Sequence, residues 1–96
     1  MRRDEALRLL KSHGADLRRF RVKSLRLFGS VARDDAAEDS DVDLLVSFEE
    51  PPGFSSFMKL RIFLEDLLGT RVDLITESGL RDRVRPHVDK EAIRVA

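Results

Sequence analysis

The chain has 96 residues, of which 42% are apolar and 38% are charged, and it contains no cysteine. This length favours a single domain over residues 1–96, and the missing cysteines exclude disulfides and thiolate metal sites. No apolar run approaches the roughly 20 residues that would cross a bilayer, and we expect a cytoplasmic protein.

The formal net charge of zero conceals an uneven distribution of charge along the chain. Residues 1–33 hold ten basic and three acidic side chains, whereas residues 34–50 hold eight acidic side chains and no basic one. The sequence predicts no continuous basic surface, and it has no Trp or Tyr to stack on bases, so direct binding of nucleic acid is disfavoured. A dense acidic stretch beside a basic segment is typical of a site that binds a cation together with an anionic ligand.

The first half of the chain predicts one helix and two strands. Apolar side chains recur at spacings of three and four over residues 4–20, which predicts an amphipathic helix with Asp4 as its N-cap. Residues 24–29 alternate between apolar and polar and predict a short strand, followed by a helical turn. The polar residues 34–40 predict a loop, and the apolar run of residues 42–48 predicts a strand that is covered on both faces.

The second half predicts a longer helix, a third strand and a helical tail. Residues 54–68 have helical spacing, and Gly69 follows where a helix is expected to stop. Residues 71–76 predict a short strand that is interrupted by one aspartate, and residues 78–95 predict two helical turns separated at Pro86. The order of helix, strand, strand, helix, strand, helix indicates an α/β domain with a small mixed sheet flanked by helices.

The acidic stretch ends in two aspartates, Asp41 and Asp43, where the second strand begins. Side chains two residues apart on a strand share a face, so both carboxylates are directed at one point. Such a pair suits a hard cation such as Mg²⁺, which prefers oxygen ligands and keeps waters that substrate phosphates can displace. Asp73 in the third strand would supply a third carboxylate if the two strands lie close together.

A Gly-Ser turn and an arginine precede these acids. Gly29 permits the backbone to approach a phosphate, Ser30 offers a hydroxyl and an amide at the start of a helical turn, and Arg33 offers a fork of donors. Together with the carboxylates, these groups suit phosphoryl or nucleotidyl transfer, because that chemistry depends on positioning and charge neutralisation.

Simpler interpretations exist for each of these residues. Asp41 and Asp43 could form a solvated acidic turn, Asp73 could cap an edge strand, and Arg33 could pair with either of the two aspartates that follow it. The acids also match several positions of an EF-hand calcium loop, but Leu44 stands where that loop needs glycine, which excludes it.

Two segments together resemble a known signature. "GSVAR", residues 29–33, and "SDVDLLV", residues 40–46, resemble the G-S-x-A-R … S-D-x-D-hydrophobic pattern of the minimal nucleotidyltransferase (MNT) domains in the DNA polymerase beta-like superfamily. The resemblance extends over nearly the whole chain, including the leading helix and the later aspartate of "VDLI". It implies the polymerase beta-like nucleotidyltransferase fold. Asp34 is a departure, because members of the family usually have glycine there.

The resemblance also implies roles for the site residues. The Gly-Ser pair would hold the phosphates of the nucleotide, and Arg33 would contact the triphosphate or fix the loop. Asp41, Asp43 and Asp73 would be the catalytic carboxylates that hold two Mg²⁺ ions. Asp73 would in addition orient or deprotonate the acceptor hydroxyl.

The resemblance further implies a partner. Standalone chains of this kind are typically antitoxins that are paired with an all-helical HEPN toxin that cleaves RNA. The implied activity is therefore protein adenylyl transfer, with AMP passing from ATP to a toxin tyrosine. One alternative is an antitoxin that neutralises its toxin by binding alone. The other is transfer to a small molecule. A chain of 96 residues leaves little room for an acceptor pocket, which weakens this alternative. Because the chain has no tyrosine, a tyrosine acceptor must lie on another molecule.

Overall fold

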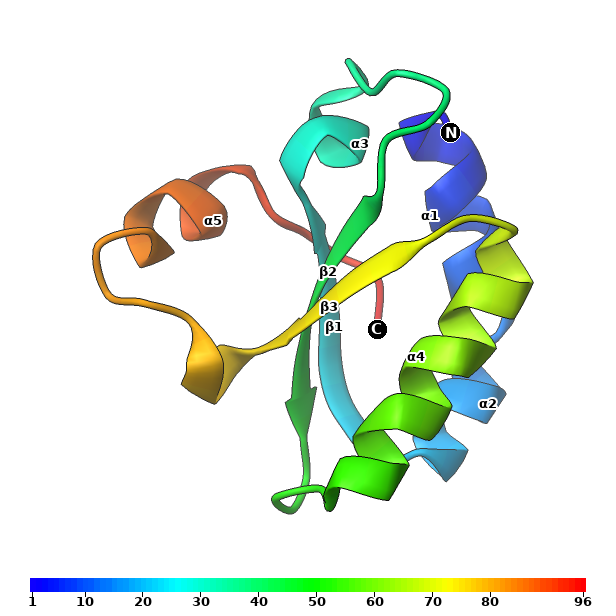
Figure 1. The fold of residues 1–96 in the computed structure, drawn as a ribbon, viewed down its shortest axis with the longest axis vertical. Helices are drawn as coiled ribbons and strands as arrows, with labels where there is room; N and C mark the ends of the chain where they lie inside the picture. The colour runs from blue at the N-terminus through cyan, green and yellow to red at the C-terminus, as the bar shows by residue number, and fades with distance from the viewer.

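The computed structural model describes all 96 residues, which form a four-stranded sheet with helices on both faces (Figure 1). The strand order is β3-β2-β1-β4. β1 (Val22–Phe28) runs antiparallel to β2 (Val42–Phe48) and to β4 (Ile93–Arg94), whereas β3 (Val72–Thr76) runs parallel to β2. The predicted α/β class and the predicted mixed sheet are therefore confirmed. None of the helices has the length and apolar character that crossing a bilayer requires.

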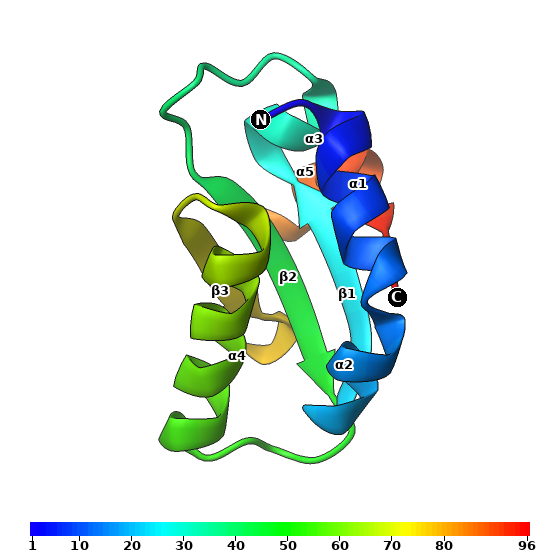
Figure 2. The same ribbon diagram turned by 90° about the vertical axis from the view of Figure 1, so that its right-hand side faces the viewer.

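Three helices cover one face of the sheet, as Figure 2 shows. They are α1 (Arg3–Ser12), α2 (Gly14–Arg19) and α4 (Phe54–Leu68). The main core lies between these helices and the sheet, and it contains 17 buried apolar side chains. Alternate residues of the strands point into it, because side chains along a strand alternate between the two faces. From the central strand β2 these are Val42, Leu44 and Val46.

The opposite face carries a much smaller apolar cluster, in which Leu45, Leu80 and Val88 are buried. It lies under the short helix α5 (Arg85–Glu91) and the 3₁₀ turn η1 (Glu77–Gly79) that follows β3. The centre of β2 is thus covered on both faces, as its unbroken apolar run predicts. The start of β2, however, extends beyond this small cluster, and polar side chains occupy the sheet there.

The helix predicted over residues 4–20 is two helices, and that prediction is wrong in its continuity. α1 ends at Ser12 and α2 begins at Gly14, because His13 leaves the helical region with φ −114° and ψ 29°. Glycine costs an uninterrupted helix about 1 kcal/mol relative to alanine, which makes this the weakest point of the apolar repeat. Asp4 is not the N-cap either, since it lies within the first turn of α1.

The tail after β3 also differs from the two predicted helical turns. Pro86 does not separate two turns but lies in the first turn of the single helix α5. Proline is tolerated there because its missing N–H would have no partner within the helix. The two residues of β4 then pair with β1, and two residues are too few for an alternating pattern to predict a strand.

Arg26 connects the sheet to η1 and α5 on its second face. Its Nη2 donates to Glu77 Oε1 at 2.8 Å and its Nη1 donates to Asp89 Oδ1 at 3.0 Å, so one guanidinium joins β1 to η1 and α5.

We expect Arg26→Gln to lower the free energy of unfolding by about 1 kcal/mol, because both ion pairs are partly exposed. Hydrogen exchange in α5 should accelerate. Lys23→Gln, an exposed change in the same strand, should alter neither quantity, and equal effects of the two variants would contradict this role.

Candidate functional site

The strand register brings two of the predicted acids side by side. Asp43 pairs with Asp73 across the parallel β2–β3 ladder, and on its other side Asp43 pairs with Phe28, the last residue of β1. The neighbours of both acids in sequence, among them Val42 and Val72, point into the main core. The carboxylates of Asp43 and Asp73 therefore lie on the opposite face of the sheet, at the end where β2 begins.

The environment of Asp43 disfavours a negative charge. Burial, followed by the charges of Asp73 and Asp41, raises the pKa of Asp43 to about 6, and the positive charge of Arg33 opposes this rise. Partly desolvated carboxylates that repel each other are stabilised by a cation placed between them. The chemistry of this donor set therefore fits a divalent metal ion such as Mg²⁺.

Asp41, whose charge acts on Asp43, forms an ion pair with an arginine. Its Oδ1 lies 3.1 Å from Nε of Arg71, the residue just before β3. No three acidic or histidine side chains lie close enough together, as they stand, to hold a metal ion. A three-carboxylate site therefore requires Asp41 to exchange Arg71 for the metal, and the assignment of Asp41 remains a prediction.

Two features restrict position 29 to glycine: the backbone conformation and the lack of space for a side chain. Its φ is +75°, a region that side-chain-bearing residues rarely adopt, and an added Cβ would collide with the carboxylate of Asp43. Only glycine therefore lets the end of β1 pass this close to Asp43. Ser30 follows in the first turn of α3 (Gly29–Arg33). The Gly-Ser pair thus lies directly beside Asp43, which is the place that the phosphate-binding prediction requires.

Arg33 is held by carboxylates in this structure. Its Nη1 lies 3.0 Å from Glu91 Oε2 and its Nε lies 3.3 Å from Asp35 Oδ2. The hydrogen bonds to Glu91 and Asp35 raise the pKa of the Arg33 guanidinium further. The simpler interpretation, a pairing with a neighbouring aspartate, is therefore true of Asp35. Glu91 was not predicted, because only the fold brings α5 beside α3.

Asp34 has a structural role that its position predicts only in part. It adopts the left-handed conformation with φ 62°, which explains why glycine suits this position. Its Oδ1 accepts a hydrogen bond from the backbone N–H of Arg3 at 3.0 Å, and its Oδ2 accepts one from Arg2 Nη2 at 2.8 Å. The hydrogen bond from Arg3 and the charges of Arg2 and Arg3 lower the pKa of Asp34. Asp34 thus supplies the N-terminal cap of α1 from outside that helix.

We expect Asp34→Ala to lower the thermal midpoint of unfolding, because alanine removes the capping hydrogen bond and keeps the unfavourable left-handed backbone. Asp34→Gly should lower it less, since glycine removes that backbone cost, and Asp34→Asn least, since its amide oxygen can still accept from Arg3. Thermal unfolding monitored by circular dichroism gives this order directly. A glycine variant less stable than the alanine variant would contradict it.

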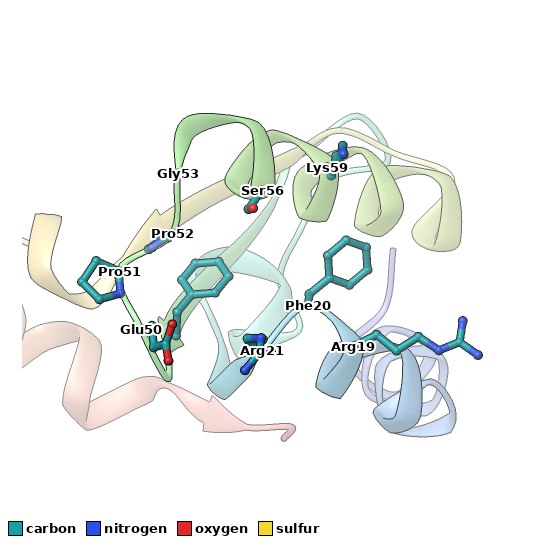
Figure 3. A pocket seen from close by; sticks show the side chains of 10 residues that line it. Arg19, Phe20, Arg21, Glu50, Pro51, Pro52, Gly53, Ser56 and Lys59 are labelled. Carbon is teal, nitrogen blue, oxygen red and sulfur yellow. The ribbon is translucent and has the colours of Figure 1, made fainter.

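A separate hollow of about 280 Å³ lies at the other end of the sheet, where β1 begins and β2 ends (Figure 3). Arg19 lines it from the end of α2, and Arg21 lines it from the turn between α2 and β1. Pro51 and Pro52 line it from the loop that leads to α4, and Lys59 lines it from α4. None of the predicted site residues lines this hollow.

Comparison with known proteins agrees with this geometry. Residues 10–95 match the nucleotidyltransferase domain family. The chain belongs to this family. It is 44% identical over 93 residues to the protein adenylyltransferase MntA of Thermococcus cleftensis, covering 96% of this chain and 94% of that protein. The predicted family is therefore confirmed.

Solved structures show the same fold. A proposed minimal nucleotidyltransferase superposes with a TM-score of 0.84 at 42% identity, covering 97% of this nucleotidyltransferase chain and 95% of that one. The MNT antitoxin in a complex with a tri-AMPylated HEPN toxin of Shewanella oneidensis superposes with a TM-score of 0.68 at 18% identity, covering 94% of this chain and 71% of that one. The second comparison supports the fold alone, and the first confirms the predicted nucleotidyltransferase fold.

Proposed function

We propose that this nucleotidyltransferase transfers AMP from ATP to a tyrosine of a HEPN toxin and thereby acts as the toxin's antitoxin. The observation that carries the proposal is the order of groups across the sheet. Gly29 lies beside Asp43, and Asp43 pairs with Asp73. The turn proposed to bind phosphate, the carboxylate proposed to bind metal and a second carboxylate thus follow one another in a line. Support for a HEPN toxin as the modified partner comes from the adenylyltransferase and the AMPylated toxin complex with which the chain compares, whereas the tyrosine is what the resemblance of the sequence implies.

Different residues of the chain would bind the metal ion and the phosphates. Asp41, Asp43 and Asp73 would hold Mg²⁺, which when bound neutralises phosphate charge and supports departure of pyrophosphate. The backbone at Gly29 and Ser30 would bind phosphate oxygens, and Arg33 would turn from Glu91 to the triphosphate.

At the β3 end of this row of groups, Asp73 would orient the tyrosine hydroxyl and accept its proton. The phenolic oxygen then forms a bond to the α-phosphorus while the bond to pyrophosphate breaks. The roles of Asp73 and of the phosphate-binding turn can be separated by kinetics.

We expect Ser30→Ala to raise the KM for ATP about tenfold with a smaller effect on kcat, because a phosphate contact acts largely through binding of the ground state. Asp73→Asn should instead lower kcat and leave the KM for ATP nearly unchanged. Steady-state transfer of label from ATP to the partner measures both constants. Equal effects of the two variants on both constants would contradict separate roles.

The direct test of the proposed function uses the chain with and without its partner. Labelled ATP and Mg²⁺ are added to the purified chain, to a HEPN toxin, and to their mixture. Label should appear on a partner tyrosine only in the mixture and should be lost with Asp43→Asn. If wild type transfers no label and the Asp43→Asn variant still neutralises the partner fully, the chain acts by binding alone.

A further inference from the structure

A cavity lies at the free edge of β3, just beyond the line of site residues. Its volume is about 260 Å³, which is below the roughly 300–1,000 Å³ of typical small-molecule pockets. A side chain or a single phosphate group therefore suits it better than a whole nucleotide. The lining residues come from the start of β2, from α4 and from β3, and they are Asp41, Phe57, Arg61, Arg71, Val72, Asp73 and Leu74.

Two arginines that line this cavity have N–H groups that are not engaged in hydrogen bonds. Arg61 Nε is buried without a hydrogen-bond partner, and the nearest acid, Glu65 Oε1, lies 3.8 Å from it, whereas the side chain as a whole is 42% exposed. Arg71 contacts Asp41 through Nε, but its side chain is 77% exposed. Because a guanidinium has five N–H donors, the outer donors of both exposed side chains can bind an additional acceptor.

The position of the cavity indicates which reactant it faces. In transfer at phosphorus, the entering and leaving oxygens lie roughly in line on opposite sides of the phosphorus atom. The Gly29–Ser30 turn lies on the β1 side of Asp43, and the cavity lies on the β3 side, at the edge of the sheet between Asp73 and the α4 residues Phe57 and Arg61. If the triphosphate and its leaving pyrophosphate occupy the Gly29–Ser30 side, the acceptor must enter from the cavity side.

We propose that Arg61 and Arg71 bind an anionic group next to the acceptor hydroxyl, with Phe57 forming an apolar wall beside it. This inference rests on the proposed function, because it assigns the acceptor side of that site. Arginine binds planar anions through paired donors, and two oxygens of a carboxylate or of a phosphodiester offer the same match. The anion has two sources: an acidic residue next to the acceptor tyrosine, or the phosphodiester of an AMP that is already attached.

The first experiment measures binding without metal, so it does not depend on transfer. Nitrogen-15 spectra of the Arg Nε–H groups are recorded while acetyl-Glu-Tyr-amide, acetyl-Gln-Tyr-amide or AMP-O-tyrosine is added in EDTA. The signal of Arg61 should shift with one or both anionic probes and remain unchanged with the glutamine peptide. If neither anionic probe shifts Arg61 more than the glutamine peptide does, the inference is wrong.

The second experiment counts AMP groups on the intact partner by mass spectrometry. Arg61→Gln is the sharper variant because Arg61 does not touch Asp41, and Arg8→Gln on the exposed face of α1 is the matched control. A tenfold or greater loss of the first addition assigns the anion to the acceptor protein, and a loss of only later additions assigns it to the attached AMP. Unchanged additions would overturn the inference. If wild type adds no AMP at all, the proposed function fails, and the binding experiment alone decides the inference.

Discussion

Asp43→Asn is expected to lower nucleotidyl transfer by about 100-fold or more and, without metal, to make the folded protein more stable. Transfer is lost because the variant removes a carboxylate from the centre of the site, where charge is neutralised in the transition state. Stability rises because asparagine removes a partly buried charge that Asp73 and Asp41 repel. The two effects have opposite signs, which a purely structural residue would not show.

The gain in stability should depend on pH. The pKa of Asp43 is about 6 in the folded state, above its ordinary value of 3.8, so the folded state binds this proton more tightly than the unfolded state does. The proton therefore stabilises wild type fully below pH 4 and is lost as the pH rises through 6. The variant should be more stable by about 1 kcal/mol above pH 6, after allowance for solvent screening, and the difference should vanish towards pH 4.

Thermal unfolding in EDTA between pH 4.5 and 7.5 measures this difference. Asp39→Asn is the matched control, because it removes one charge from an exposed residue of the neighbouring loop. It should change neither transfer nor the pH dependence of stability. An Asp43→Asn variant much less stable than wild type at pH 7.5 would show that the carboxylate is structural, and the assignment of the metal site would fail.

Gly29→Ala is expected to lower both the stability and the activity strongly. The alanine Cβ would have to displace the carboxylate of Asp43, whose Cγ would lie 3.0 Å away, and the backbone would keep a φ of +75°. We expect a loss of about 2–4 kcal/mol in the free energy of unfolding, which combines the left-handed backbone with the collision. Transfer should fall with it, because the displaced group is Asp43 itself.

Gly69→Ala separates the two causes. Gly69 also has a positive φ, +69°, but an added Cβ would meet nothing within 4 Å. This variant should cost only about 1 kcal/mol and leave transfer intact. In addition, Gly29→Ala should cost less in an Asp43→Ala background, because the collision is then absent. Equal costs of Gly29→Ala in both backgrounds would show that the backbone conformation alone matters.

Much of the fold could be predicted because the patterns are local. The unbroken apolar run of β2, the helical spacing of α4 and the stop at Gly69 all result from side-chain alternation and glycine conformation. The predictions failed where tertiary contacts outweigh local pattern. The pairing of β4 with β1 depends on neighbours far along the chain, and no periodicity over a few residues reports it.

The family and the groups proposed for the site could be predicted from local motifs, because the spacing of "GSVAR" and "SDVDLLV" is a property of the chain alone. The arrangement of these groups in space depends on tertiary contacts that no motif reports. Strand register places Asp73 beside Asp43, whereas the paths of β3 and α5 pair Asp41 with Arg71 and Arg33 with Glu91. Register and packing are set by the burial of Val42, Leu44 and Val72 in the core, residues that take no part in the chemistry. Their burial fixes which face and which neighbour each carboxylate has.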